Sequence, residues 1–89
     1  MPGGPLELHP QVALRPESFG ALAYHYGNRR LSFLRSPELV ELVRSLADHP
    51  GTDEALAASG IEAARWPTFR TAVDSLLRSE VVRERPAAR

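Results

Sequence analysis

The sequence contains three histidines, His9, His25 and His49. They are candidates for a metal site, because imidazole is a common metal ligand. A metal site needs three or four convergent ligands, and none of the three stands at ligand spacing from another histidine or from a pair of aspartates. The chain also has no cysteine, so no thiolate can complete such a site. We therefore expect no bound metal and no cofactor.

Carboxylate pairs that could act as general acid and base occur in the ranges 38–41 and 53–54. Both pairs fall in the first turn of a segment with helical pattern, where the helix dipole favours negative side chains. Ser36 and Thr52 stand at helix-capping positions, which accounts for them without a nucleophilic role. No glycine-rich phosphate loop is present, because PGGP at the start precedes no apolar strand or helix. These patterns predict a protein that is not an enzyme.

The segment AYHYGNRRLSF, residues 23–33, has the pattern of a β-hairpin with a two-residue loop at Gly27 and Asn28. Such a loop places Tyr24 opposite Leu31. The large side chains then share one face, which we expect to be buried: Leu22, Tyr24, Leu31 and Phe33. Smaller or polar side chains share the other face, which we expect to be exposed: Ala21, Ala23, His25, Arg30 and Ser32.

Two helices are predicted after the hairpin. The first has Ser36 as N-cap and Pro37 in its first turn, and it ends before Pro50. Its apolar stripe consists of Leu39, Leu42, Val43 and Leu46. The second helix is short, with Thr52 as N-cap and Gly60 as terminator.

A third helix has the strongest periodic signal of the chain. Pro67 is expected to open it, and that proline should hold Trp66 in an extended conformation. Its apolar residues recur at helical spacing: Phe69, Ala72, Val73, Leu76 and Leu77. With a short strand around residues 12–14, the order is three strands and then three helices. That order predicts an α+β domain of the winged helix-turn-helix type, with a three-stranded antiparallel sheet.

The 89 residues are enough for one domain, which we expect over 11–83, between a flexible arm at 1–10 and a frayed tail at 84–89. Eleven arginines balance eleven carboxylates, so no overall field favours nucleic acid or an anionic membrane. The start has neither a cationic region nor an apolar run, and no later apolar run approaches the roughly 18 residues of a membrane span. We expect a cytoplasmic protein.

DNA binding is the alternative function that a winged helix raises. A recognition helix needs several cationic or amide side chains on its exposed face. The third helix offers Arg65, Arg70 and Arg78, but Asp74 and Glu80 dilute them. We therefore expect no nucleic-acid partner, and a DNA-binding regulator remains the second interpretation.

The third strand, residues 29–35, is the remaining candidate site. It contains no proline and no charge at its middle, so its backbone donors and acceptors form an uninterrupted row. Arg29, Arg30 and Arg35 mark its ends. A peptide could add here as a further strand, with its acidic side chains meeting these arginines. An equally simple interpretation is that the arginines protect an open edge from aggregation.

A resemblance to a known family rests on one long run that starts at Leu8, LHPQVALRPESFGALAYHYGNRRLSFLRSPELVELVRSLADHPGTDEAL. It resembles the mycofactocin biosynthesis peptide chaperones, which are similar to the pyrroloquinoline quinone peptide chaperones. The likeness extends over residues 8–83, and FGALAYHYGNRRL and SPELVELVRSLADHP are its most specific parts.

The resemblance implies a domain that binds the leader of a ribosomally made precursor peptide and presents it to a radical S-adenosylmethionine maturase. It implies that the leader adds beside the third strand and lies against the third helix. The strand positions so assigned are Arg30, Leu31, Ser32, Phe33, Leu34 and Arg35. The helix positions, chosen by periodicity, are Phe69, Arg70, Val73 and Leu77. An iron–sulfur cluster would belong to the partner, because this chain has no cysteine ligands.

Overall fold

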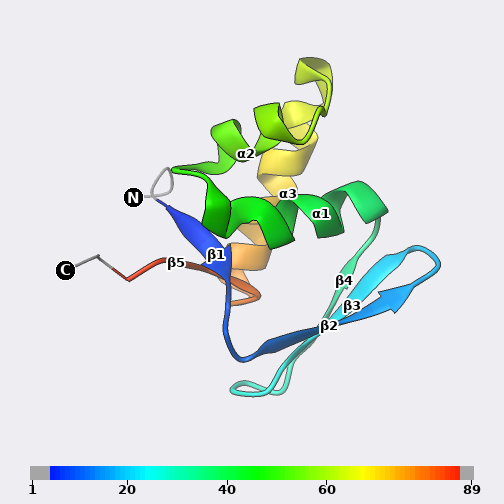
Figure 1. Ribbon diagram of the computed structural model, residues 1–89. Helices are drawn as coiled ribbons and strands as arrows, with labels where there is room; N and C mark the ends of the chain where they lie inside the picture. Colours follow the sequence, from blue (N-terminus) through cyan, green and yellow to red (C-terminus); the bar gives the residue numbers. More distant parts are fainter. Residues whose placement is uncertain (1–4, 87–89) are drawn as a thin grey trace.

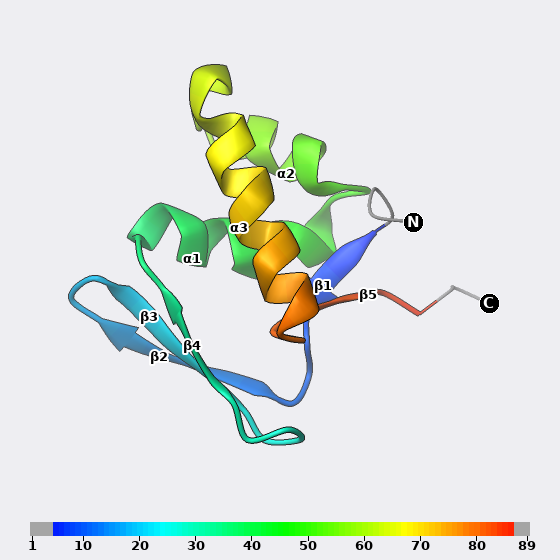
Figure 2. The same ribbon diagram turned by 180° about the vertical axis from the view of Figure 1, so that it is seen from behind.

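The computed structural model describes residues 5–86, and its fold is α+β, as expected (Figure 1). A three-stranded antiparallel sheet has the order β2 (Val12–Glu17), β3 (Gly20–His25), β4 (Leu31–Leu34). The helices follow as α1 (Pro37–Ser45), η1 (Leu46–Asp48), α2 (Thr52–Ala58), η2 (Ala63–Arg65) and α3 (Trp66–Arg78). The three α-helices lie on the same side of the sheet in both views (Figure 2).

The first and last strands form a separate two-stranded pair, which the sequence pattern does not indicate. β1 (Leu6–Leu8) and β5 (Val82–Glu84) are antiparallel, with Leu6 opposite Glu84. Leu6 is buried, so this part of the expected flexible arm is packed into the core; residues 1–4 lie outside the described range. Likewise, the expected tail overlaps β5 at Glu84, and residues 87–89 are not described.

The register predicted for the hairpin is confirmed, because Tyr24 lies opposite Leu31 and Leu22 opposite Phe33. The assignment of its two faces is wrong. Ala23 is fully buried, whereas 59% of Leu31 is exposed. The small side chains of Ala21 and Ala23 leave room for α1 to pack closely against β3, and that close packing decides which face is buried.

The hairpin loop is also longer than the two residues predicted. His25 donates its N–H to the Arg30 carbonyl oxygen at 3.0 Å, which closes a four-residue loop over 26–29. Arg29, with φ 63°, is the residue that adopts the left-handed conformation. The register survives because the longer loop adds one residue to each side of the predicted one.

The N-cap of α1 is as predicted, since Ser36 Oγ accepts a hydrogen bond from the Leu39 N–H at 3.1 Å. For α2 the cap is one residue earlier than predicted, at Gly51, and no side chain caps it. Trp66 is helical rather than extended, with φ −58° and ψ −41°. Its Nε1–H donates to the Ile61 carbonyl oxygen at 2.8 Å, which supports this additional first residue of α3.

Candidate functional site

β4 is an edge strand of the sheet, as is β2 on the other side, and each of the two pairs only with β3. In an antiparallel pair, successive residues direct their backbone groups alternately toward and away from the partner strand. Arg30 accepts the hydrogen bond from His25, so the alternation directs Ser32 and Leu34 toward β3 as well. The N–H and C=O groups of Leu31 and Phe33 therefore point away from the sheet, toward the open edge. The sequence alone does not decide which residues of β4 direct their backbone groups toward the open edge.

A hollow of about 290 Å³ lies between the end of β4, the start of α1 and α3. Its walls combine apolar and cationic side chains: Arg35, Ser36, Leu39, Arg65, Thr68, Phe69 and Ala72. The structure thus brings together two residues that the sequence analysis selected separately, Arg35 and Phe69. We call this hollow the β4–α3 hollow.

Arg65 fixes the wall of the β4–α3 hollow by joining α3 to α1. Its guanidinium forms two parallel hydrogen bonds to the Glu38 carboxylate, at 2.7 and 2.9 Å. The hydrogen bond from Arg65 lowers the pKa of Glu38, so the carboxylate stays ionised and the pair stays charged. Arg65 also lies over the Phe69 ring, 5.2 Å from its centroid.

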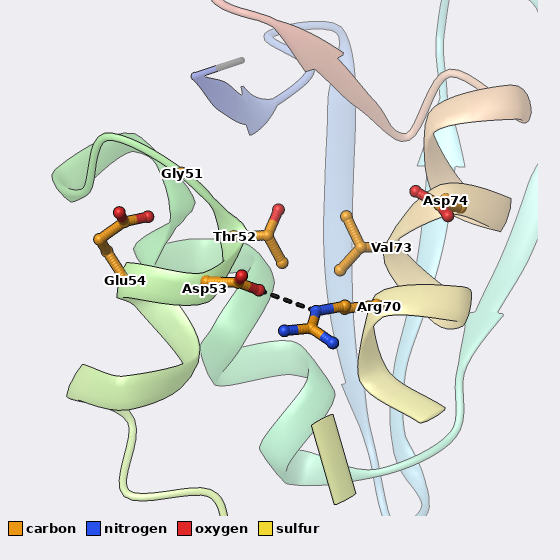
Figure 3. A pocket seen from close by; sticks show the side chains of 7 residues that line it. All are labelled: Gly51, Thr52, Asp53, Glu54, Arg70, Val73 and Asp74. Carbon is orange, nitrogen blue, oxygen red and sulfur yellow. Dashed lines mark hydrogen bonds and ion pairs between the residues drawn. The ribbon is translucent and has the colours of Figure 1, made fainter. Parts of the chain in front are cut away.

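The other helix positions selected from periodicity lie elsewhere. Arg70 and Val73 line a second hollow, of about 430 Å³, between α2 and α3 (Figure 3). Arg70 Nε donates to the Asp53 carboxylate at 2.8 Å, and this hydrogen bond lowers the pKa of Asp53. Leu77 is half-buried against the core.

The six strand positions also differ in what they offer. The side chains of Leu31 and Phe33 are exposed on the sheet face away from the helices, and Arg30 and Arg35 are exposed at the two ends of β4. Leu34 has no exposed area, so its side chain belongs to the core. Ser32 is half-buried and contributes its backbone groups to β3.

Five of the seven residues that line the β4–α3 hollow were not predicted as site residues. Leu39, Thr68 and Ala72 line it, and the last two share a helical face with Phe69 at i−1 and i+3. The helical period already places Thr68, Phe69 and Ala72 on one side of the helix. Which side of α3 faces β4, however, depends on how the helix is rotated against the sheet. Only the tertiary packing fixes that rotation.

Within residues 5–86, no group of three or more histidine, cysteine or carboxylate residues is arranged to hold a metal ion. Across the same residues, no helix combines the length and apolar character that a membrane span requires.

Comparison with known proteins gives a consistent result. The model of the Peptide chaperone MftB family matches residues 5–83. A peptide chaperone MftB of Mycolicibacterium smegmatis is 48% identical over 75 residues, which cover 84% of this chain and 74% of that protein. A peptide chaperone MftB of Mycobacterium ulcerans is 45% identical over 75 residues, covering 84% and 69%. That of Mycobacterium tuberculosis is 51% identical over 55 residues, covering 62% and 50%. No solved structure matches significantly.

Proposed function

This chain belongs to the MftB peptide chaperone family, and on that premise we propose that it binds the leader of a ribosomally made precursor peptide by β-strand addition. The relatives are named as chaperones, which is a non-catalytic role. The proposal includes presentation of the bound leader to a radical S-adenosylmethionine maturase in mycofactocin biosynthesis, in the cytoplasm where the precursor is made. We assign the domain to the winged-helix type on the order of its sheet and helices.

The observation that carries the proposal is the unpaired backbone row of β4 beside the β4–α3 hollow. Leu31 and Phe33 offer their N–H and C=O groups at this edge, as the pairing with β3 implies. An added strand would satisfy these groups and so remove the cost of an open edge. Arg30 and Arg35 flank the row and would meet acidic residues of the leader.

The side chains of an added strand alternate between two faces. One set would face the helices, where Arg35 and Phe69 already line a partly apolar hollow of about 290 Å³. The other set would extend the exposed face of the sheet beside Leu31 and Phe33. The remaining positions of the proposed site, Arg70, Val73 and Leu77, would contact only a leader that continues around α3.

The backbone of Leu31 provides the test. In Leu31→Pro the N–H that points to the open edge is lost, while the bonds from β4 to β3 remain because Ser32 and Leu34 make them. Leu31→Ala is the matched control, since it removes the side chain and keeps the N–H. We expect Leu31→Pro to weaken leader binding by about tenfold or more, and Leu31→Ala to weaken it much less.

The measurement is fluorescence anisotropy with a labelled leader peptide of the pathway's precursor, together with circular dichroism to establish that both variants are folded. Equal affinity of folded Leu31→Pro and Leu31→Ala would show that no strand adds at this edge. Equal loss in both variants would assign the effect to the side chain and would also contradict strand addition.

A further inference from the structure

The sheet face opposite the helices carries a group of exposed apolar side chains. Among the described residues, the large apolar side chains that are exposed are Phe19, Tyr26, Leu31 and Phe33. All four gather at this face, where Leu22 and Tyr24 lie half-buried between them. We call these six residues the outer sheet face. A contiguous apolar patch on a small soluble protein marks a surface that another molecule covers.

Contacts between aromatic rings hold the side chains of the outer sheet face in place. Phe19 packs edge to face against Phe33, with ring centroids 5.9 Å apart. Tyr24 and Tyr26 form a second edge-to-face pair at 5.0 Å, and Arg35 lies over the Phe33 ring at 5.3 Å from its centroid. Side chains held in this way lose little conformational entropy when a partner binds, which favours affinity.

The charges of the three strands of this sheet and of the loops between them are predominantly positive. Residues 12–35 contain four arginines and a single carboxylate, Glu17, which pairs with Arg15 at 3.2 Å. Within the described part of the chain, no ion pair involves Arg29, Arg30 or Arg35. Residues 37–80 contain eight carboxylates and four arginines, so the helical side has the opposite sign. The net charge of the chain is zero, but the sheet is cationic.

This charge distribution indicates which kind of partner would bind the outer sheet face. A symmetric pairing of two copies through the outer sheet face would bring the same arginines against one another, which costs free energy. A surface with carboxylates around an apolar centre would instead match both the rings and the arginines. We propose that the outer sheet face docks such an acidic, apolar-centred surface of a partner protein.

The proposal rests on the proposed function in one respect: the partner that must approach while the leader is bound is the maturase. A leader strand at β4 leaves the outer sheet face uncovered, and it adds its own outward side chains beside Leu31 and Phe33. A maturase docked on this face would contact chaperone and leader together. The chaperone without a leader and the chaperone with a bound leader would then differ at the surface that the maturase contacts.

The test uses two variants that leave the β4 edge intact. Phe19→Ser/Tyr26→Ser removes two exposed rings, and Arg15→Glu reverses one charge at the rim. Arg78→Glu, at the end of α3 and therefore on the other side of the sheet from the outer sheet face, is the control for charge reversal. Binding of the purified maturase and of the labelled leader is measured separately for each variant, with circular dichroism as the check on folding.

We expect the double variant to weaken maturase binding by about tenfold or more, with leader affinity within about twofold of wild type. Arg15→Glu should weaken maturase binding most at low salt, whereas Arg78→Glu should not. Unchanged maturase binding in both sheet variants, while the leader still binds, would overturn this inference alone. Absence of leader binding to the wild-type protein would contradict the proposed function.

Two other occupants give distinct results. If light scattering shows a wild-type dimer that the double variant converts to a monomer, the face pairs with a second copy and the proposal is wrong. If wild type binds phosphatidylglycerol vesicles and the double variant does not, the face binds lipid, and the proposal is equally wrong.

Discussion

His25 shows how one side chain can organise a loop. Its ring is buried, and Nδ1 accepts hydrogen bonds from the N–H groups of Gly27 at 2.9 Å and Asn28 at 3.1 Å. An imidazole nitrogen accepts hydrogen bonds through its lone pair, so Nδ1 serves both loop N–H groups as the acceptor. The residue that composition would assign to metal chemistry therefore supports the loop that leads into β4.

His9 lies against His25, with ring centroids 4.4 Å apart. Burial lowers the pKa of His9 from its ordinary value of 6.5, and the charges of His25 and Arg83 lower it further. The carboxylates Glu7 and Glu80 act in the opposite direction without reversing the shift. The folded protein consequently resists protonation of His9 more than the unfolded chain does.

We predict that the free energy of unfolding falls as the pH decreases below about 6.5, because the unfolded chain then takes up a proton at His9 that the folded protein does not. His9→Gln should reduce this dependence, and His49→Gln, which leaves the His9–His25 contact in place, should retain it. Urea unfolding of the three proteins at pH 7.5 and 5.5 measures the effect. The same pH dependence in all three would rule out His9 as its source.

At the scale of elements, the turn between β2 and β3 depends on Gly20. Its φ of 149° is rarely adopted by other residues, and a Cβ there would come far inside contact distance of the Leu34 carbonyl oxygen. Since Leu34 is fully buried at the end of β4, the backbone cannot move aside without disturbing the core. One glycine thus permits the close approach of the β2–β3 turn to the edge strand.

We predict that Gly20→Ala destabilises the protein by more than the about 1–2 kcal/mol that a positive φ alone costs an alanine. Gly60→Ala is the matched control, because Gly60 has φ 74° and no atom within 4 Å of the position its Cβ would take. That variant should lose only about 1 kcal/mol. Chemical denaturation compares the two variants, and equal losses would mean that the contact with Leu34 is relieved at no cost.

Some features of the helices and strands could be predicted from the sequence alone, and others could not. Helical periodicity, the Ser36 cap and the hairpin register were predictable because each depends on residues close together in the chain. The buried face of the sheet was not, because large apolar side chains such as those of β4 usually mark the core face, whereas here α1 packs against the small Ala21 and Ala23. The same misassignment hid the outer sheet face.

The candidate site divides in the same way. An open third strand could be predicted from a run without proline, and the structure has β4 at the edge of its sheet. Periodicity alone does not decide which helix positions share a hollow, since Phe69 and Arg70 are adjacent in sequence but line different hollows. Nor could the pairing of Arg65 with Glu38 be predicted, because 27 residues separate them.

At the scale of the whole molecule, charge is separated although its total is zero. The sheet is cationic and the helical part is anionic. Two of the three arginines that DNA binding would use, Arg65 and Arg70, are already paired with carboxylates. A field of this kind orients an acidic partner toward the sheet before contact. A phosphate backbone, which is itself anionic, would be repelled by the anionic helical side.

We predict that Arg30→Glu lowers the association rate of an acidic leader by about three- to tenfold at low salt, with a smaller effect on its dissociation rate, because Arg30 is exposed at the end of β4 and acts through the field. The difference from wild type should shrink as salt rises to about 0.5 M. Arg44→Glu, an equal charge change in the last turn of α1, is the control and should leave the rate nearly unchanged. Stopped-flow fluorescence with the labelled leader measures these rates. If both substitutions slow association equally, net charge rather than the cationic sheet guides the leader.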